Sequence, residues 1–147
     1  MAGYNYPMTK FRFHYPISVR YGDLDPQWHV NNSKFLTYIE TARLQYLLKL
    51  GLFDGHSFND LPFIVADVHV KYLLPIQPTD DVLVTLGTTR IGTKSAIMEY
   101  EVWSADETRL FATAETVMVA YDYATKSSVP VSAELRRTIS EYEGIQL

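Results

Sequence analysis

One long helical pattern among several strand patterns is the feature that most limits how this chain can fold. Apolar residues recur with helical spacing over residues 34–50, and Gly51 stands where a left-handed helix end is expected. The remaining regular segments alternate as strands, over residues 11–21, 63–74, 81–91, 95–103 and 109–122. This β-α-β-β-β-β order predicts an α+β fold in which an antiparallel sheet packs against one dominant helix.

The apolar arc of the predicted helix is unusually wide. Phe35, Ile39, Ala42 and Tyr46 form its centre, and further leucines broaden it. We therefore expect a curved sheet of about five strands that wraps the helix. Arg43 falls inside this arc, and Glu40 is close enough along the helix to pair with it. Such a pair would be either structural or part of a site.

Length and composition predict a single domain over residues 1–147, with a loose arm at 1–10 and a possible helix at 131–143 that Ser132 could cap. The net charge is −4 and no basic tract is present, which argues against a nucleic-acid partner. The absence of cysteine excludes disulfides and thiolate metal sites. Without a signal-peptide pattern or a long apolar run, we expect a cytoplasmic protein with no membrane partner.

Residues 20–43, RYGDLDPQWHVNNSKFLTYIETAR, concentrate the groups that can carry chemistry. A strand ends in Asp23 and Asp25, His29 follows a turn, and the helix then begins. A helix start has unpaired N–H groups and roughly half a positive charge, which suits a developing oxyanion. A carboxylate beside it can act as a base or a nucleophile.

Each of these residues also has a simpler structural interpretation. Asp25 precedes a proline and could only shape the turn, while Asp23 could close the strand or pair with Arg20. Asn31, Asn32 or Ser33 could each cap the helix. Asp25, His29 and His69 lack the local spacing of metal ligands, so we predict no metal site.

The same segments resemble the hot-dog-fold acyl-CoA thioesterases, in particular the 4-hydroxybenzoyl-CoA thioesterase-like group. The resemblance rests on the segments RYGDLDP (20–26), HVNN (29–32), YIETAR (38–43) and LG (50–51). Further along the chain, Pro75 and DDV (80–82) resemble the family's strand entry, and GTKS (92–95) resembles its next hairpin. It implies a long helix lying in a curled antiparallel sheet. It also implies dimers that join two sheets, sometimes tetramers, with active sites between subunits.

The resemblance further implies roles for particular residues. Asp25 matches the catalytic acid, and the Asn32 N–H matches the group that polarises the carbonyl, with Asn31 or Ser33 as its alternatives. His29 matches a histidine of plant acyl-carrier-protein thioesterases, although Gln27 departs from that pattern. The other residues expected to contact substrate are Phe35 and Tyr38 for the acyl group, His69 unless it lies on a solvated face, and Arg90, Lys94 and Ser95 for the phosphates of CoA.

The function that follows from the resemblance is hydrolysis of an acyl-CoA thioester to a free acid and CoA, with no cofactor. Two alternatives stay open. One is an acyl-CoA or lipid-binding protein of the same fold that does not catalyse. The other is a different hot-dog enzyme, such as a dehydratase of hydroxyacyl thioesters. The sequence does not distinguish an aromatic from an aliphatic acyl group, CoA from acyl-carrier protein, or a dimer from a tetramer.

Overall fold

The helices and strands follow the predicted order closely in the computed structural model, which describes residues 9–147. The predicted arm at 1–10 lies mostly outside these residues. The main elements are β1 (Phe13–Ser18), α1 (Asn32–Lys49), β2 (Phe63–Tyr72), β3 (Asp81–Ile91), β4 (Ser95–Ser104), β5 (Leu110–Asp122) and α2 (Ala133–Glu143). Three short elements complete the structure: the 3-10 turns η1 (Tyr21–Asp23) and η2 (Phe58–Asp60), and the strand β6 (Ser127–Ser128).

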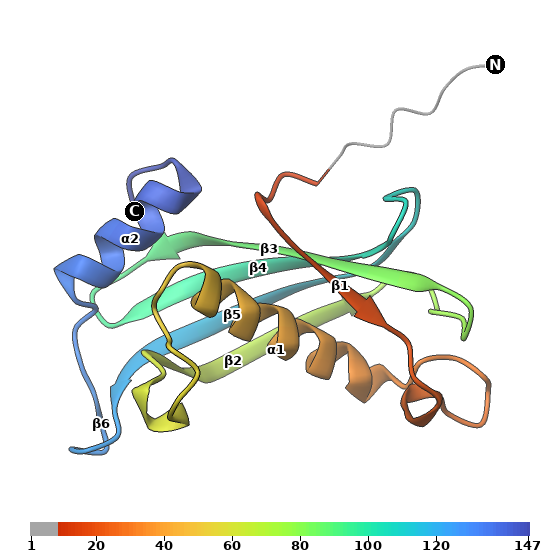
Figure 1. Ribbon diagram of the computed structural model, residues 1–147, viewed down its shortest axis with the longest axis horizontal. Coiled ribbons are helices and arrows are strands. Elements are labelled where there is room, and N and C mark those ends of the chain that lie inside the picture. The colour runs from red at the N-terminus through yellow and green to blue at the C-terminus, as the bar shows by residue number, and fades with distance from the viewer. Residues whose placement is uncertain (1–8) are drawn as a thin grey trace.

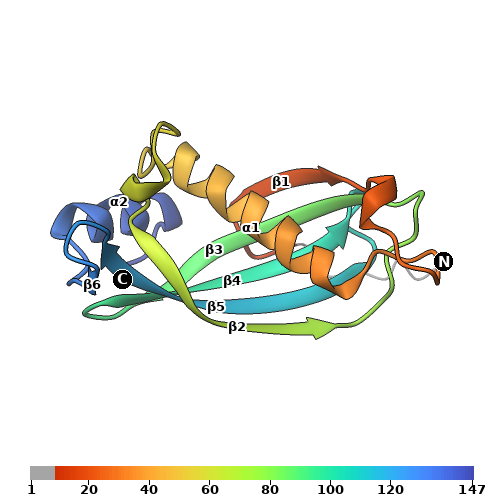
Figure 2. The same ribbon diagram turned by 90° about the horizontal axis from the view of Figure 1, so that it is seen from below.

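The main strands form an antiparallel sheet in the order β1-β3-β4-β5-β2, with β6 paired to β5. The sheet curls around α1, as expected from the wide apolar arc (Figures 1 and 2). Register shifts at Val65/Asp67 and Thr88/Arg90 mark bulges, which increase the local bend of a strand. Pro16 is accommodated because β1 is an edge strand. The other edge is β2, whose outer side pairs with no strand in the part of the chain that the structure describes.

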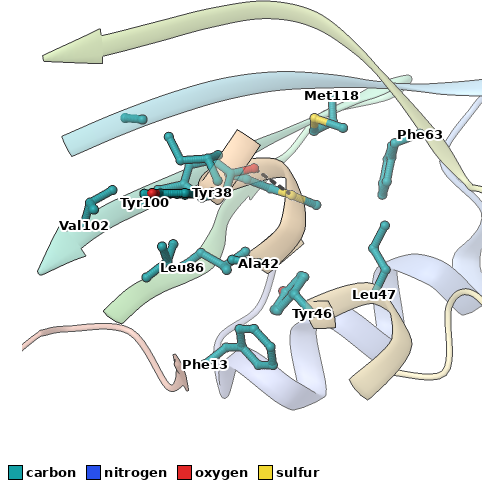
Figure 3. Close-up of a cluster of buried hydrophobic side chains, with 14 of the residues drawn as sticks. Phe13, Tyr38, Ala42, Tyr46, Leu47, Phe63, Leu86, Tyr100, Val102 and Met118 are labelled. Atoms are coloured by element: carbon teal, nitrogen blue, oxygen red, sulfur yellow. Dashed lines mark hydrogen bonds between the residues drawn. The ribbon is translucent and has the colours of Figure 1, made fainter. Parts of the chain in front are cut away.

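The central helix presents its apolar arc to the concave face of the sheet. Its buried side chains are Phe35, Tyr38, Ile39, Ala42, Tyr46 and Leu47, many of which appear in Figure 3. Leu36 differs from the expectation: it is 41% exposed and faces away from the core. Asn31 caps the helix by accepting a hydrogen bond from the Ser33 N–H, and Gly51 has φ +71° as predicted for the C-terminal end.

Arg43 does not form the expected pair with Glu40. Its guanidinium instead donates to the hydroxyl of Tyr100 on β4 at 3.3 Å, and no ion pair to Arg43 is formed among residues 9–147. The Tyr100 hydroxyl also lies 3.0 Å from the Thr116 hydroxyl. Arg43 therefore bonds to the polar part of the sheet under the helix, while Glu40 is left exposed.

The C-terminal helix α2 is joined to the rest of the core by a buried polar contact. The Tyr46 hydroxyl donates to Glu143 at 2.6 Å, and the Thr88 N–H donates to the same carboxylate oxygen at 3.1 Å. Burial and the neighbouring carboxylate raise the pKa of Tyr46 above its usual range. Ser132 caps α2, as predicted, by accepting from the Leu135 N–H at 3.1 Å.

Candidate active site

Asp23, the first acid of the β1–α1 connection, is a structural residue. It is 2% exposed and accepts hydrogen bonds from the Tyr38 hydroxyl at 2.7 Å and the Arg20 N–H at 3.0 Å. Burial and this carboxylate raise the pKa of Tyr38 above its usual range. The contact to Arg20 and the closure of the strand agree with the structural interpretation of Asp23. Tyr38 is thereby held in the core by its hydroxyl.

Asp25, the second acid, shapes a tight turn with one carboxylate oxygen and leaves the other free. Its Oδ1 accepts the Gln27 N–H at 2.9 Å and, more weakly, the His29 N–H at 3.5 Å. The backbone closes the turn through Asp25 N–H to His29 O at 2.9 Å and Trp28 N–H to Asp25 O at 3.0 Å. Oδ2 accepts no hydrogen bond within residues 9–147. The turn therefore fixes the carboxylate while one oxygen stays available.

The start of α1 supplies one unpaired N–H next to this turn. Asn31 Oδ1 accepts both the Ser33 N–H at 2.9 Å and the Ser33 hydroxyl at 2.8 Å, while Asn31 O accepts the Lys34 N–H at 2.8 Å. The Asn32 N–H, at the first helical position, has no acceptor among the described residues. Asn31 and Ser33 thus stabilise the helix end, and Asn32 is the residue whose N–H is free.

A hollow of about 260 Å³ brings these groups together. Asp25, His29, Asn32 and Phe35 contribute to one wall, and the chain that ends β2, Tyr72 to Pro75, forms the other. The Tyr72 hydroxyl donates to Asn32 O at 3.0 Å, and its ring meets the Phe35 ring edge-on with centroids 5.0 Å apart. The arrangement can place a carbonyl between a carboxylate and a free N–H at a helix start.

Seven residues expected to contact substrate do not line this hollow in the described protomer. Two of them, Asn31 and Ser33, bond to each other at the helix end. Tyr38 is buried beneath it on Asp23. His69 pairs across the sheet with the exposed Glu115, so it lies on the convex face, away from α1. Arg90, Lys94 and Ser95 sit at the β3–β4 hairpin, at the other end of the sheet. On β5, Val119 pairs with Ser95 of β4, and Ala112 pairs with Tyr72 of β2. The length of strand between Val119 and Ala112 places the hairpin about 23 Å from the hollow.

Sequence reasoning missed the wall that follows β2. Tyr72, Leu73, Leu74 and Pro75 line the hollow, but nothing near them in the sequence indicates a site. The alternation of side chains along β2 is the one sequence feature that could have pointed to Tyr72. Since Val70 and Tyr72 have the opposite parity to His69, only one of these two sets can face the helix.

Other kinds of site are not seen in the described part of the chain. No three histidine or acidic residues within 9–147 are arranged to hold a metal ion. No helix among the described residues combines the length and the apolar character needed to span a membrane.

Comparison with known proteins identifies the family. The sequence profile of the thioesterase-like superfamily matches residues 19–139, which include the whole hollow and most of the sheet. The chain belongs to this superfamily. Within it, this member is 26% identical to the long-chain acyl-CoA thioesterase FadM of Escherichia coli over 125 residues, which is 85% of the chain and 95% of FadM.

Solved structures agree with this assignment and with the hot-dog fold. A thioesterase from Thermus thermophilus complexed with coenzyme A and Zn is 33% identical to this superfamily member, with a TM-score of 0.82. The match covers 93% of this chain and 98% of that structure. A 1,4-dihydroxy-2-naphthoyl-CoA thioesterase from Synechocystis has the same fold, at 21% identity, a TM-score of 0.77 and coverage of 88% and 96%.

Proposed function

We propose that this protein hydrolyses the thioester bond of acyl-CoA molecules at the Asp25 hollow. One observation carries the proposal: Asp25, with a carboxylate oxygen that accepts no hydrogen bond, and Asn32, with an N–H that has no acceptor, line the same hollow. The relatives named as acyl-CoA and CoA-bound thioesterases support the substrate class.

In the proposed reaction the substrate carbonyl oxygen accepts the Asn32 N–H, at the positive end of α1. One such donor is commonly worth about 3 kcal/mol of transition-state stabilisation. Asp25 Oδ2 then has two possible roles. As a base it takes a proton from a water molecule whose oxygen attacks the carbonyl; as a nucleophile it attacks directly and water cleaves the resulting anhydride. In both routes the C–S bond breaks, CoA leaves as a thiolate that takes up a proton, and the acid is released. We assign His29, on the same wall, to holding the attacking water.

We also propose that a complete site needs a second copy of the chain. The expected CoA contacts on the β3–β4 hairpin, Arg90 and Lys94, are too far from Asp25 within one protomer. The hairpin lies near Ile64, at the start of β2, and Asp25 lies near Tyr72, at its end. If two β2 edges pair antiparallel, the hairpin of one copy comes beside the hollow of the other. The unpaired outer side of β2 is long enough for such pairing.

The proposal is tested by measuring hydrolysis of short, long and aromatic acyl-CoAs by the wild-type protein and by Asp25→Asn. The substitution retains an amide oxygen that can accept the Gln27 N–H, so the turn should survive while the charge is lost. We expect kcat to fall by about 10²–10⁴-fold, the usual range for loss of an acid–base group. Asp67→Asn, on the convex face, is the matched control and should keep wild-type rates.

Two results would contradict the proposal. If the wild-type protein hydrolyses none of the substrates, the chain is not an acyl-CoA thioesterase. If Asp25→Asn keeps full activity, the reaction does not use this carboxylate. Label found in Asp25 after a single turnover in ¹⁸O-labelled water would identify the nucleophilic route, because it enters this carboxylate only when water attacks an anhydride at the Asp25 carbonyl.

A further inference from the structure

Asp23 is a buried carboxylate beside the site, and the proposed reaction does not use it. Its side chain is 3% exposed and lies two residues before Asp25 in the chain. Burying a carboxylate costs free energy unless hydrogen bonds replace those lost to water. The bonds that Asp23 makes therefore indicate what this acid contributes.

Hydrogen bonds join Asp23 to three other points of the chain. Its Oδ2 accepts the Arg20 N–H, just after β1, at 3.0 Å, and the Tyr38 hydroxyl, in the second turn of α1, at 2.7 Å. Its main-chain carbonyl accepts the Asn31 N–H, at the cap of α1, at 2.8 Å. Asp23 thus ties the end of the first strand to two separate points on the central helix.

These bonds hold the two groups that the proposed reaction uses. Asp25 follows Asp23 by two residues, and Asn32 directly follows Asn31. Asn31 and Tyr38 are about 10 Å apart along the helix axis, and the Tyr38 side chain reaches back because helical side chains point toward the N-terminus. Since α1 is held at two points, both the position and the tilt of its start are set relative to the Asp25 turn.

We propose that Asp23 and Tyr38 are positioning residues of thioester hydrolysis, whose hydrogen bond sets the distance between the Asp25 carboxylate and the Asn32 N–H. This inference rests on the proposed function and adds two residues to its machinery. Neither side chain touches the reacting atoms, because both residues are 2% exposed and neither lines the hollow. A shift of about 1 Å in such a site can lower the rate about 100-fold, since the carbonyl then no longer meets both groups at once.

The other end of α1 offers a matched contact that is not part of the site. Tyr46 is 0% exposed, and its hydroxyl donates to the Glu143 carboxylate at 2.6 Å. Tyr38 and Tyr46 both belong to the buried cluster in Figure 3. Tyr38→Phe and Tyr46→Phe each remove one buried hydroxyl bonded to a carboxylate, so both should lower the melting temperature by a similar amount, about 3–8 °C. Only Tyr38→Phe disturbs the start of the helix.

The first measurement is steady-state hydrolysis of the acyl-CoA that the wild-type protein cleaves fastest, at a temperature well below both melting points. We expect Tyr38→Phe to lower kcat about 10–100-fold and to change KM by less than about threefold. Tyr46→Phe should keep the wild-type kcat. Asp23→Asn retains an amide oxygen that can accept both side-chain bonds. It should therefore keep far more activity than Asp25→Asn.

The second measurement needs no substrate. Amide hydrogen exchange followed by NMR reports on the Asn31 N–H, which is bonded to the Asp23 carbonyl. The reference is the N–H of Val102, a fully buried residue of the central strand β4. In Tyr38→Phe we expect the Asn31 N–H to exchange at least about fivefold faster relative to this reference. Tyr46→Phe should leave the ratio unchanged.

The outcomes separate this inference from the proposed function. If no acyl-CoA is hydrolysed but Asn31 exchange rises only in Tyr38→Phe, Asp23 holds the helix start as inferred and the proposed activity fails. If acyl-CoAs are hydrolysed and Tyr38→Phe keeps the wild-type kcat, or loses no more than Tyr46→Phe, the inference is overturned while the proposed function stands. A loss in Asp23→Asn as large as that in Asp25→Asn would also overturn it, because Asp23 would then act through its charge.

Discussion

Glu143 joins α2 to both α1 and β3, and its removal gives the most direct test of how the core is held together. Its Oε1 accepts the Tyr46 hydroxyl at 2.6 Å and the Thr88 N–H at 3.1 Å. Tyr46 is 0% exposed, so water cannot easily replace the lost acceptor. After Glu143→Ala the Tyr46 hydroxyl keeps one neighbour, the Thr88 hydroxyl at 3.0 Å, but the Thr88 N–H loses its partner.

The expected cost follows from these two bonds. A hydrogen bond to a charged group contributes about 1.5–3 kcal/mol. Because Glu143 is itself half-buried, water can partly compensate, and we expect Glu143→Ala to lower the free energy of unfolding by about 2–4 kcal/mol. Tyr46→Phe removes only one of the bonds and should cost about 1–2 kcal/mol. Since the two residues are in contact, the double variant should cost less than the sum of the single ones.

The raised pKa of Tyr46 adds a pH dependence with a defined sign. Below the ordinary tyrosine pKa, near 10, the hydroxyl is neutral in both the folded and the unfolded chain, so its contribution to stability is fully present. Above pH 10 the unfolded chain loses this proton while the folded chain keeps it, so stability falls as the pH rises. Tyr46→Phe should therefore lose less stability than the wild-type protein between pH 9 and about pH 11.

Urea denaturation followed by circular dichroism measures these quantities for the wild-type protein, both single variants and the double variant. Glu141→Ala, an exposed neighbour on α2, is the control and should unfold within about 0.5 kcal/mol of the wild-type protein. The reasoning would be refuted if Glu143→Ala were as stable as this control, or if the effects of the two single variants were additive.

Two further changes test local features. Gly87→Ala should lower the free energy of unfolding by about 1–3 kcal/mol, because the added Cβ would come within 2.9 Å of the Phe11 ring. Gly22→Ala is the control, since a Cβ there meets nothing within 4 Å. Similar melting temperatures for the two variants would contradict this. Hydrogen bonds, first from the Ser104 hydroxyl, lower the pKa of Asp106 to about 2. Its contribution is present above about pH 4 and lost as the pH falls toward 2, so urea titrations should show a smaller loss of stability over this window in Asp106→Asn than in the wild-type protein.

The parts of the fold that could be predicted are those governed by periodicity and local capping. The spacing of Phe35, Ile39 and Ala42 predicted both the helix and its buried face, and β3 was predicted without error at either end. Leu36 was misplaced because a wide apolar arc does not indicate where the sheet stops covering the helix. That limit depends on the position of β2, which is a tertiary property.

The same division holds for the candidate site. Asp25 and His29 lie in the short loop before α1 and Asn32 is the first residue of the helix, so their closeness in the sequence was enough to bring them together. Tyr72 reaches the site across the fold, with a hydrogen bond to a residue 40 positions away, and Arg43 found its partner 57 positions away rather than on its own helix. Alternation placed His69 and Tyr72 on opposite faces, but only the position of the helix decides which face is the inner one.

The strand order has a consequence for how the chain acquires its structure during synthesis. β1 and β2 are made first, yet they become the two opposite edges of the sheet, and neither pairs with the other. All of their partners, β3 and β5, lie after residue 80. A ribosome-bound chain that has emerged only to this point has no sheet to form, and its apolar helix face has no cover. The β3-β4-β5 meander, with its local connections, is then the natural place for folding to begin, and the early half of the chain completes its structure by adding to it.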